Sequence, residues 1–202
     1  FNVADKYRTP VMMLSDGMMG QMKEPVVFPE PVGTLPEKEW ALRGRGDGPS
    51  RYLCSLILDA MEMERHNWKL VRKYGEIEKN EIRYEEYMLD DAEIVVIAYG
   101  TTARIAKGAI KRVRKDGVKA GLLRPITLWP FPRKALADLA TRIRQFVVFE
   151  MSTGQMLEDV QIALAGKADI VFHGRPGGVV PTPVEFARII YREYQKTAKI
   201  QL

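Results

Sequence analysis

The sequence predicts an α/β fold, in which an open and mostly parallel β-sheet lies between two layers of helices. The first observation is the stretch 94–98, five consecutive apolar residues closed off by Gly100. A continuous apolar run before a glycine is typical of a strand buried on both faces of a parallel sheet. The second observation is repetition, because further strands are predicted to begin near residues 118, 145 and 169. Strand–helix alternation at this spacing favours right-handed crossovers within one sheet.

Each predicted strand is followed by a helical pattern, in which apolar residues recur three and four positions apart. The stripes are Ala106, Ala109, Ile110 and Val113; Leu136, Leu139, Ala140 and Ile143; Leu157, Val160 and Leu164; and Phe186, Ile189 and Ile190. Gly117 is expected to end the first helix, and residues 152–155 have the spacing of a capping box for the third. The last helix is predicted to begin after Thr182, with Pro183 in its first position and Glu185 completing the cap.

The N-terminal part of the chain is less regular. Residues 1–9 are predicted to be the end of a helix that Pro10 stops, and residues 11–14 a short buried strand before a turn at Ser15-Asp16-Gly17. Four prolines in residues 25–36 exclude regular helix and indicate an extended connector.

A glycine-rich loop and a long charged segment follow this connector. Residues 43–50 are expected to be the loop. Residues 59–90 contain no proline and carry a narrow apolar stripe, which predicts one long helix, or two separated near Gly75. Such a helix either crosses the surface of a domain or links two domains.

Composition sets limits on the class of protein. Hydrophobic residues make up 46% of the 202 residues, and no apolar run approaches the ~20 residues that cross a bilayer. The first residues lack the pattern of a signal peptide and lack an initiator methionine, so we expect a fragment that begins in mid-chain. Cys54 is the single cysteine, which excludes an internal disulfide and a self-contained iron–sulfur cluster and fits a reducing cytoplasm.

Charge divides the chain into two unequal halves. Residues 1–100 carry a net charge of −5, and residues 101–202 carry +10. A basic half attracts an acidic partner, an anionic cofactor or nucleic acid. The simpler interpretation, which we favour, is a set of solvated helix faces. No nucleic-acid-binding motif with interleaved aromatic residues is present in the sequence, which argues against a nucleic-acid partner.

Ligands and partners of such a sheet meet the carboxyl ends of its strands. Residues at those ends are, in strand order, Gly100, Thr101 and Thr102; Arg124; Glu150 and Ser152; and His173 and Arg175. The N–H groups that begin the first helix are candidates for holding an anion beside Arg124 and Arg175. Because no nucleophile–base pair is evident by spacing, we favour the alternative in which Thr101 or Thr102 only caps its helix and the charged groups face another subunit.

Four stretches of this sequence are similar to one known family. They are residues 97–104 (IAYGTTAR), 123–132 (LRPITLWPFP), 150–156 (EMSTGQM) and 174–178 (GRPGG). Together they resemble the C-terminal half of the alpha subunit of 2-oxoacid:ferredoxin oxidoreductases, and the branched-chain (2-ketoisovalerate) type most closely.

The resemblance implies a division of the chain into three parts. Residues 1–36 resemble the tail of the domain that binds the pyrimidine of thiamine pyrophosphate, followed by the proline-rich connector. Residues 37–90 form a linker with the long charged helix. Residues 91–202 resemble a transketolase C-terminal-like domain.

The resemblance also implies a reaction, in which a 2-oxoacid and coenzyme A become an acyl-CoA and carbon dioxide while ferredoxin is reduced. Thiamine pyrophosphate, magnesium and iron–sulfur clusters serve the assembled enzyme, and none is expected to be bound by this piece alone. Expected partners are a thiamine diphosphate-binding beta subunit, a gamma subunit and a ferredoxin-like delta subunit. No catalytic residue is carried over, and the eight carboxyl-end residues remain candidates for an interface or an anion site.

Two alternatives stay open at this point. One is the C-terminal domain of another thiamine enzyme, such as a transketolase or a 2-oxoacid dehydrogenase component. The other is a stand-alone regulatory module that binds anions through the basic half.

Overall fold

The computed structural model describes residues 1–31, 38, 40–42, 44–50 and 52–200, and side chains as far as residue 196. It divides the chain into two compact units. Unit 1 comprises Phe1–Leu14 and Lys23–Glu81, and unit 2 comprises Ser15–Met22 and Ile82–Leu202. Each unit is described by itself.

Unit 2 is built on a sheet of five strands in the order β1-β3-β2-β4-β5. The strands are β1 Tyr84–Tyr87, β2 Ile94–Ala98, β3 Ala120–Pro125, β4 Gln145–Glu150 and β5 Asp169–Gly174. Strands β2 to β5 pair in parallel, and β1 pairs with β3 in the antiparallel direction. The predicted open, mostly parallel sheet is therefore confirmed. Three of the four strand starts expected from the sequence fall on the predicted residue, and β3 begins two residues later, at Ala120.

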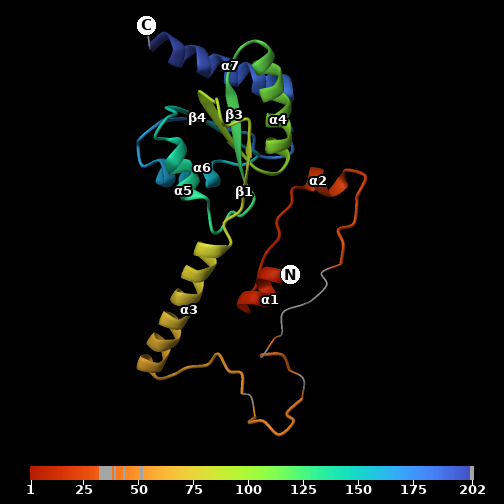
Figure 1. The fold of residues 1–202 in the computed structure, drawn as a ribbon, viewed down its shortest axis with the longest axis vertical. Coiled ribbons are helices and arrows are strands. Elements are labelled where there is room, and N and C mark those ends of the chain that lie inside the picture. The colour runs from red at the N-terminus through yellow and green to blue at the C-terminus, as the bar shows by residue number, and fades with distance from the viewer. Residues whose placement is uncertain (32–37, 39, 43, 51, 201–202) are drawn as a thin grey trace. The chain divides into compact units, whose positions relative to one another are not determined.

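Two helices cover each face of the sheet (Figure 1). Helices α4 (Gly100–Lys115) and α7 (Pro183–Ile200) pack on one face, and α5 (Arg133–Leu139) and α6 (Gln155–Leu164) on the other. Most of the predicted apolar stripes are fully buried, while Leu157 and Ile189 are half-buried against the core. Helix α5 ends at Leu139, so the last two residues of its stripe reach the core from the turn that follows.

The position of β2 fixes the functional edge of the sheet. Its five residues have no exposed surface, and it pairs with β3 on one side and β4 on the other. Helices α4 and α6 leave the carboxyl ends of β2 and β4 on opposite faces and lead to strands on opposite sides. The region between these two strand ends, called the crevice below, is therefore the topological switch point, the place at which open α/β sheets bind ligands.

Of two predictions for the N-terminal ninety residues, the long helix is confirmed only as far as Asn80, and the short strand at residues 11–14 is wrong. Helix α3 extends from Ala60 to Asn80 and passes through Gly75 without a break, and the chain then forms the short strand β1. Strand β1 has only four residues, and their alternating exposure is also compatible with one face of a helix. Hydrophobic periodicity therefore did not distinguish a strand from a helix in this charged segment. Residues 11–14 form no strand, and their side chains are 51% to 94% exposed, since the described residues of unit 1 contain no strand that could pair with them.

Unit 1 contains helix α1 (Asn2–Tyr7) and helix α3. Glu81 joins them, because its carboxylate accepts hydrogen bonds from Lys6 Nζ at 2.8 Å and Tyr7 Oη at 2.9 Å. The helix expected in residues 1–9 is confirmed. The connector has no regular structure in residues 25–31. Its remaining residues, 32–36, and positions 37, 39, 43 and 51 lie outside the described part of the chain.

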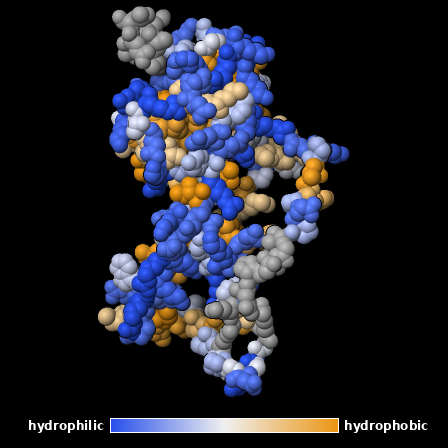
Figure 2. Space-filling view, viewed as in Figure 1, coloured by the Kyte–Doolittle hydropathy of each residue, from blue (hydrophilic) through white to orange (hydrophobic). Residues whose placement is uncertain are grey.

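The visible surface of unit 2 is mainly hydrophilic, with smaller apolar areas between the charged side chains (Figure 2). Across the described residues, no helix combines the length and the apolar character needed to cross a bilayer.

Replacing Gly121 with alanine tests the packing of β1 and its following turn on the sheet. A Cβ atom at this position would lie 2.6 Å from the Met88 carbonyl oxygen and 2.6 Å from Leu89 Cδ2. We expect Gly121→Ala to lower the free energy of unfolding by about 1–3 kcal/mol, as overpacking does. Gly108→Ala in α4 is the control, because its nearest contact would be an ordinary 3.5 Å to Pro183. Equal losses for the two variants in chemical denaturation would contradict this account.

Candidate functional site

The crevice between β2 and β4 brings together five of the eight residues that the sequence placed at the carboxyl edge. Gly100, Thr101 and Thr102 form the first turn of α4, Glu150 ends β4, and Ser152 follows it. The other three lie on the flanking strands β3 and β5 or directly after them. The edge therefore consists of a central group and two separate flanks.

Asp16 occupies the start of α4. Its carboxylate accepts hydrogen bonds from the Thr101 backbone N–H at 3.0 Å and from the Thr101 hydroxyl at 2.8 Å. Gly100 has a φ of 56°, and a Cβ there would lie 3.0 Å from Asp16 Oδ2, so both conformation and space favour glycine. The helix N-terminus that the sequence suggested for an external anion thus holds a carboxylate of the chain itself.

The same carboxylate begins a second helix. Asp16 is the N-cap of α2 (Gly17–Gln21) and accepts the Met19 backbone N–H at 2.9 Å. Burial by itself would raise the pKa of Asp16, but the hydrogen bonds from Met19 and Thr101 outweigh it and lower the pKa below the ordinary 3.8. Asp16 is therefore ionised at neutral pH and ties the segment Ser15–Met22 to the sheet edge.

Neither threonine is the N-cap of α4, contrary to the interpretation favoured from the sequence. The N-cap is Tyr99, whose side chain makes no capping bond. Thr102 is buried, and its hydroxyl lies 2.7 Å from the Tyr99 carbonyl oxygen and 3.2 Å from that of Phe149. This hydroxyl therefore lies between the start of α4 and the end of β4.

Glu150, the last residue of β4, places its carboxylate at the start of α6. It is 1% exposed, and its carboxylate accepts the backbone N–H groups of Met156 at 3.1 Å and Leu157 at 2.9 Å. The Ser152 hydroxyl donates a third hydrogen bond at 2.7 Å. The predicted capping box at residues 152–155 is wrong, because the N-cap is Gly154 and Glu150 already serves the free N–H groups of the helix. Burial raises the pKa of the nearby Tyr99 hydroxyl, and the Glu150 charge adds to that rise.

Both arginines of the predicted anion site are engaged by carboxylates. Arg124 Nη1 lies 3.0 Å from Glu85 Oε2 on the neighbouring strand β1, and Lys107 pairs with the same carboxylate. Hydrogen bonding from Lys107 is the largest cause of the lowered pKa of Glu85, with Arg124 adding to it. Arg175 pairs with Glu185 in the first turn of α7. Among the described residues, neither guanidinium group forms a hydrogen bond with the first turn of α4.

His173 stands apart from the central crevice, on the edge strand β5. Its ring centroid is 5.8 Å from that of Phe149, and its Nε2 atom is buried without a hydrogen-bond partner among the described residues. Burial is the main cause that lowers its pKa, and Arg192 lowers it further. A neutral imidazole at physiological pH follows from this environment.

At the carboxyl edge, acidic side chains of the chain itself stabilise the helix starts and neutralise the neighbouring arginines. The carboxylates of Asp16 and Glu150 complete two helix starts, and those of Glu85 and Glu185 neutralise the flanking arginines. The described residues contain no group of three or more His, Cys, Asp or Glu side chains able to hold a metal ion. Sequence reasoning placed Glu150 at the carboxyl edge and Glu185 in the cap of the last helix, but it missed Glu85 and the link from Asp16 to Thr101, because these partners lie far apart in the sequence.

Asp16→Asn tests the carboxylate at the start of α4. The amide keeps one oxygen acceptor but loses the charge, so we expect unit 2 to lose roughly 1 kcal/mol at neutral pH. Because the folded-state pKa of Asp16 is lowered, the advantage of the wild type is present above its ordinary pKa of 3.8 and disappears as pH falls through the folded value. Chemical denaturation of unit 2 at pH 7 and pH 3 measures the difference.

Asp59→Asn provides a matched control for this test. Asp59 caps α3 through the Glu62 N–H at 2.9 Å, in unit 1, so its replacement should leave the unfolding of unit 2 unchanged. The difference between wild type and Asp16→Asn should be smaller at pH 3 than at pH 7, and an equal difference at the two pH values would contradict a role for the ionised carboxylate.

Comparison with known proteins identifies the α/β unit. Residues 92–186 match the family described as pyruvate:ferredoxin oxidoreductase core domain II. The chain is 48% identical over 179 residues to the ketoisovalerate oxidoreductase subunit VorB of Methanothermobacter marburgensis, covering 88% of this chain and 51% of that subunit. It is 31% identical over 219 residues to the 2-oxoglutarate synthase subunit KorA of Methanothermobacter thermautotrophicus, covering 95% and 58%. The chain thus spans about half the length of the curated relatives it matches.

A solved structure shares the fold. The 2-oxoglutarate:ferredoxin oxidoreductase from Magnetococcus marinus, with 2-oxoglutarate, coenzyme A and succinyl-CoA bound, matches with a TM-score of 0.58 at 20% identity. The match covers 69% of this chain and 24% of that one. The resemblance drawn from the four sequence stretches is confirmed. Through residues 92–186 the α/β unit is similar to core domain II of pyruvate:ferredoxin oxidoreductases, and the chain as a whole is similar to subunits of 2-oxoacid:ferredoxin oxidoreductases.

Proposed function

We propose that this chain is part of the alpha subunit of a 2-oxoacid:ferredoxin oxidoreductase that acts on a branched-chain substrate. The observation that carries the proposal is the 48% identity over 179 residues to a ketoisovalerate oxidoreductase subunit, against 31% to a 2-oxoglutarate synthase subunit. The reaction is the oxidative decarboxylation of a 2-oxoacid. Coenzyme A takes the acyl group, carbon dioxide leaves, and the electrons released reduce ferredoxin.

The role proposed for this piece is to support the fold and form subunit contacts. At its carboxyl edge, the acidic groups serve helix starts or neighbouring arginines, so they are already committed within the chain. A rigid, internally neutralised edge suits a surface against which another domain packs. We therefore assign the eight residues first singled out there to an interface rather than to chemistry, and we expect the isolated piece to be inactive.

The proposed domain assignment follows the same logic. Residues 1–36 are the tail of the domain that binds the pyrimidine of thiamine pyrophosphate, residues 37–90 a linker, and residues 91–202 the transketolase C-terminal-like domain. Two structural facts bear on these bounds. Strand β1 extends the sheet back to Tyr84, and Ser15–Met22 is part of unit 2.

Cofactors of the assembled enzyme are proposed to be held by other parts. Thiamine pyrophosphate supplies the electron sink for decarboxylation, and iron–sulfur clusters carry the electrons onward. The sequence has one cysteine, whereas a cluster is ligated by about four, so this chain by itself does not fit one. We propose a beta subunit that binds thiamine diphosphate and its magnesium, a gamma subunit and a ferredoxin-like delta subunit, in the cytoplasm.

Reconstitution tests the function. The chain is mixed with the complementary N-terminal half of the VorB subunit and with its partner subunits, and viologen reduction is followed. We expect reduction that requires this chain, coenzyme A and a 2-oxoacid, and that is faster with 2-ketoisovalerate than with 2-oxoglutarate. Absence of activity under every pairing, or transfer to lipoamide in place of a ferredoxin-type acceptor, would overturn the proposal.

Arg124→Ala separates an interface role from a structural one. The pair with Glu85 is partly exposed, so its loss should change the free energy of unfolding by less than about 1 kcal/mol. Assembly with the partner subunits, measured by native mass spectrometry, should nevertheless weaken. Lys119→Ala is the control, because it removes a comparable pair with Glu93 at the opposite edge of the sheet. A large loss of thermal stability for Arg124→Ala would make this arginine structural instead.

A further inference from the structure

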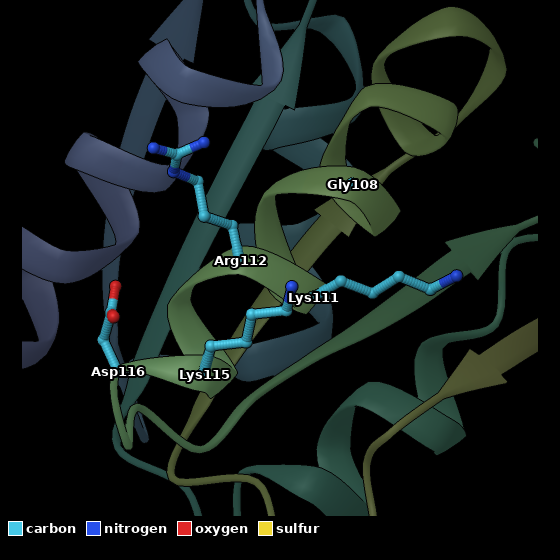
Figure 3. A pocket seen from close by; sticks show the side chains of 5 residues that line it. All are labelled: Gly108, Lys111, Arg112, Lys115 and Asp116. Atoms are coloured by element: carbon cyan, nitrogen blue, oxygen red, sulfur yellow. The ribbon is translucent and has the colours of Figure 1, made fainter.

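The outer surface of α4 and α7 carries two adjoining hollows that the carboxyl edge does not explain. One has a volume of about 410 Å³ and is lined by the C-terminal half of α4 (Figure 3). The other has a volume of about 480 Å³ and lies between α4 and α7. Arg112 and Asp116 line both, and Figure 3 shows the Arg112 side chain extending toward α7. We call the two hollows together the α4–α7 groove.

Four cations line this groove without a carboxylate partner. Within the described residues, Lys111, Arg112, Lys115 and Arg188 form no ion pair. Cations elsewhere in unit 2 commonly do, including Lys107, Arg114, Lys119, Arg133, Arg175 and Lys196. The groove therefore carries four cations beside a single carboxylate, Asp116, which forms no ion pair with them among the described residues, whereas most other cations of the domain are paired.

The helix dipoles explain the position of only some of the four cations in the groove. Arg112 and Lys115 lie in the last turn of α4, where cations interact favourably with the helix dipole. Arg188 lies in the second turn of α7, close to the positive end of that helix, where a cation gains nothing from the dipole. Its presence there favours an external anion.

The floor of the groove is apolar. Val113 and Ala187 are buried beneath it, while Val184 and Tyr191 of α7 are 38% and 41% exposed. Cations around an apolar floor suit a surface that carries both acidic and apolar side chains. A free phosphate or a nucleotide phosphate would use the cations and leave this floor uncovered.

We propose that the α4–α7 groove is a docking surface for an acidic, amphipathic segment of a partner protein. The α4 wall from Gly108 to Asp116 is roughly 12 Å long at 1.5 Å per residue, which matches about two turns of a helix. Acidic side chains of the segment face the four cations, and its apolar side chains cover Val184 and Tyr191. Complementary charge of this kind sets specificity and speeds association.

The test uses a fluorescent helical peptide with glutamate on one face and leucine on the other. Its binding to the full chain is measured by fluorescence anisotropy, beside a scrambled peptide of the same composition. We expect the amphipathic peptide to bind more tightly than the scrambled one, with an affinity that falls as salt rises. Equal binding of the two peptides, or no binding, overturns the proposal.

Charge reversals locate the binding. Arg112→Glu should weaken peptide binding about tenfold, and Arg188→Glu should also weaken it. Lys167→Glu is the matched control, because this exposed lysine follows α6 on the other face of the sheet and should leave binding unchanged. The exposed positions of all three residues make folding of the variants straightforward to confirm by circular dichroism.

Two competitors separate the alternatives. Inorganic phosphate at matched ionic strength should displace the peptide no better than chloride does, and a single-stranded oligonucleotide should not displace it from the wild type. Displacement by phosphate would identify a small-anion site, and displacement by the oligonucleotide a nucleic-acid surface. Either of these results would overturn the proposed acidic protein partner. The proposal would also be overturned if Lys167→Glu weakened peptide binding as much as the groove variants do.

Discussion

The placement of every element in unit 2 depends on the double burial of β2. This strand is hydrogen-bonded along both edges, and its side chains fill the cores of both faces. Ile94, Val96 and Ala98 pack toward α4 and α7, while Val95 and Ile97 pack toward α5 and α6. A single run of five apolar residues thus sets the number of layers and, with α4 and α6 leaving on opposite faces, the location of the crevice.

The crevice itself is organised by carboxylates that belong to the chain. Each parallel strand delivers a helix whose first N–H groups have no partner within the helix. Asp16 satisfies this need for α4 and Glu150 for α6, and the second does so while almost fully buried. An edge built in this way offers a defined surface with little free charge, which fits a supporting role in a larger enzyme.

The contrast with the outer helix layer is informative. Arg124 and Arg175 at the carboxyl edge are matched by Glu85 and Glu185, whereas Arg112 and Arg188 in the groove have no such match among the described residues. The sequence shows only that the second half of the chain is basic. Pairing within the fold decides which part of that charge remains available to a partner.

Hydrophobic periodicity predicted most of the fold. The runs at β2 and β4 and the stripe of α4 are local patterns, so they can be recognised without knowing the tertiary contacts. Strand β1 was missed because its four residues are half charged, and its pairing with β3 is a non-local event. The sequence placed Glu150 at the carboxyl edge, but the link from Asp16 to α4 was missed for a related reason. Asp16 and Thr101 are 85 positions apart, and no local signal connects them.

The discontinuity of unit 2 has a consequence for how the chain holds together. Ser15–Met22 joins the sheet although Lys23–Glu81, which belongs to the other unit, intervenes. The closing of so long a loop is tolerated because each doubling of its length adds only about 0.6 kcal/mol of entropic cost. The intervening segment acts as a tether that keeps Asp16 at a high effective concentration near α4. A single proteolytic cut anywhere in that tether would turn an intramolecular contact into a bimolecular one.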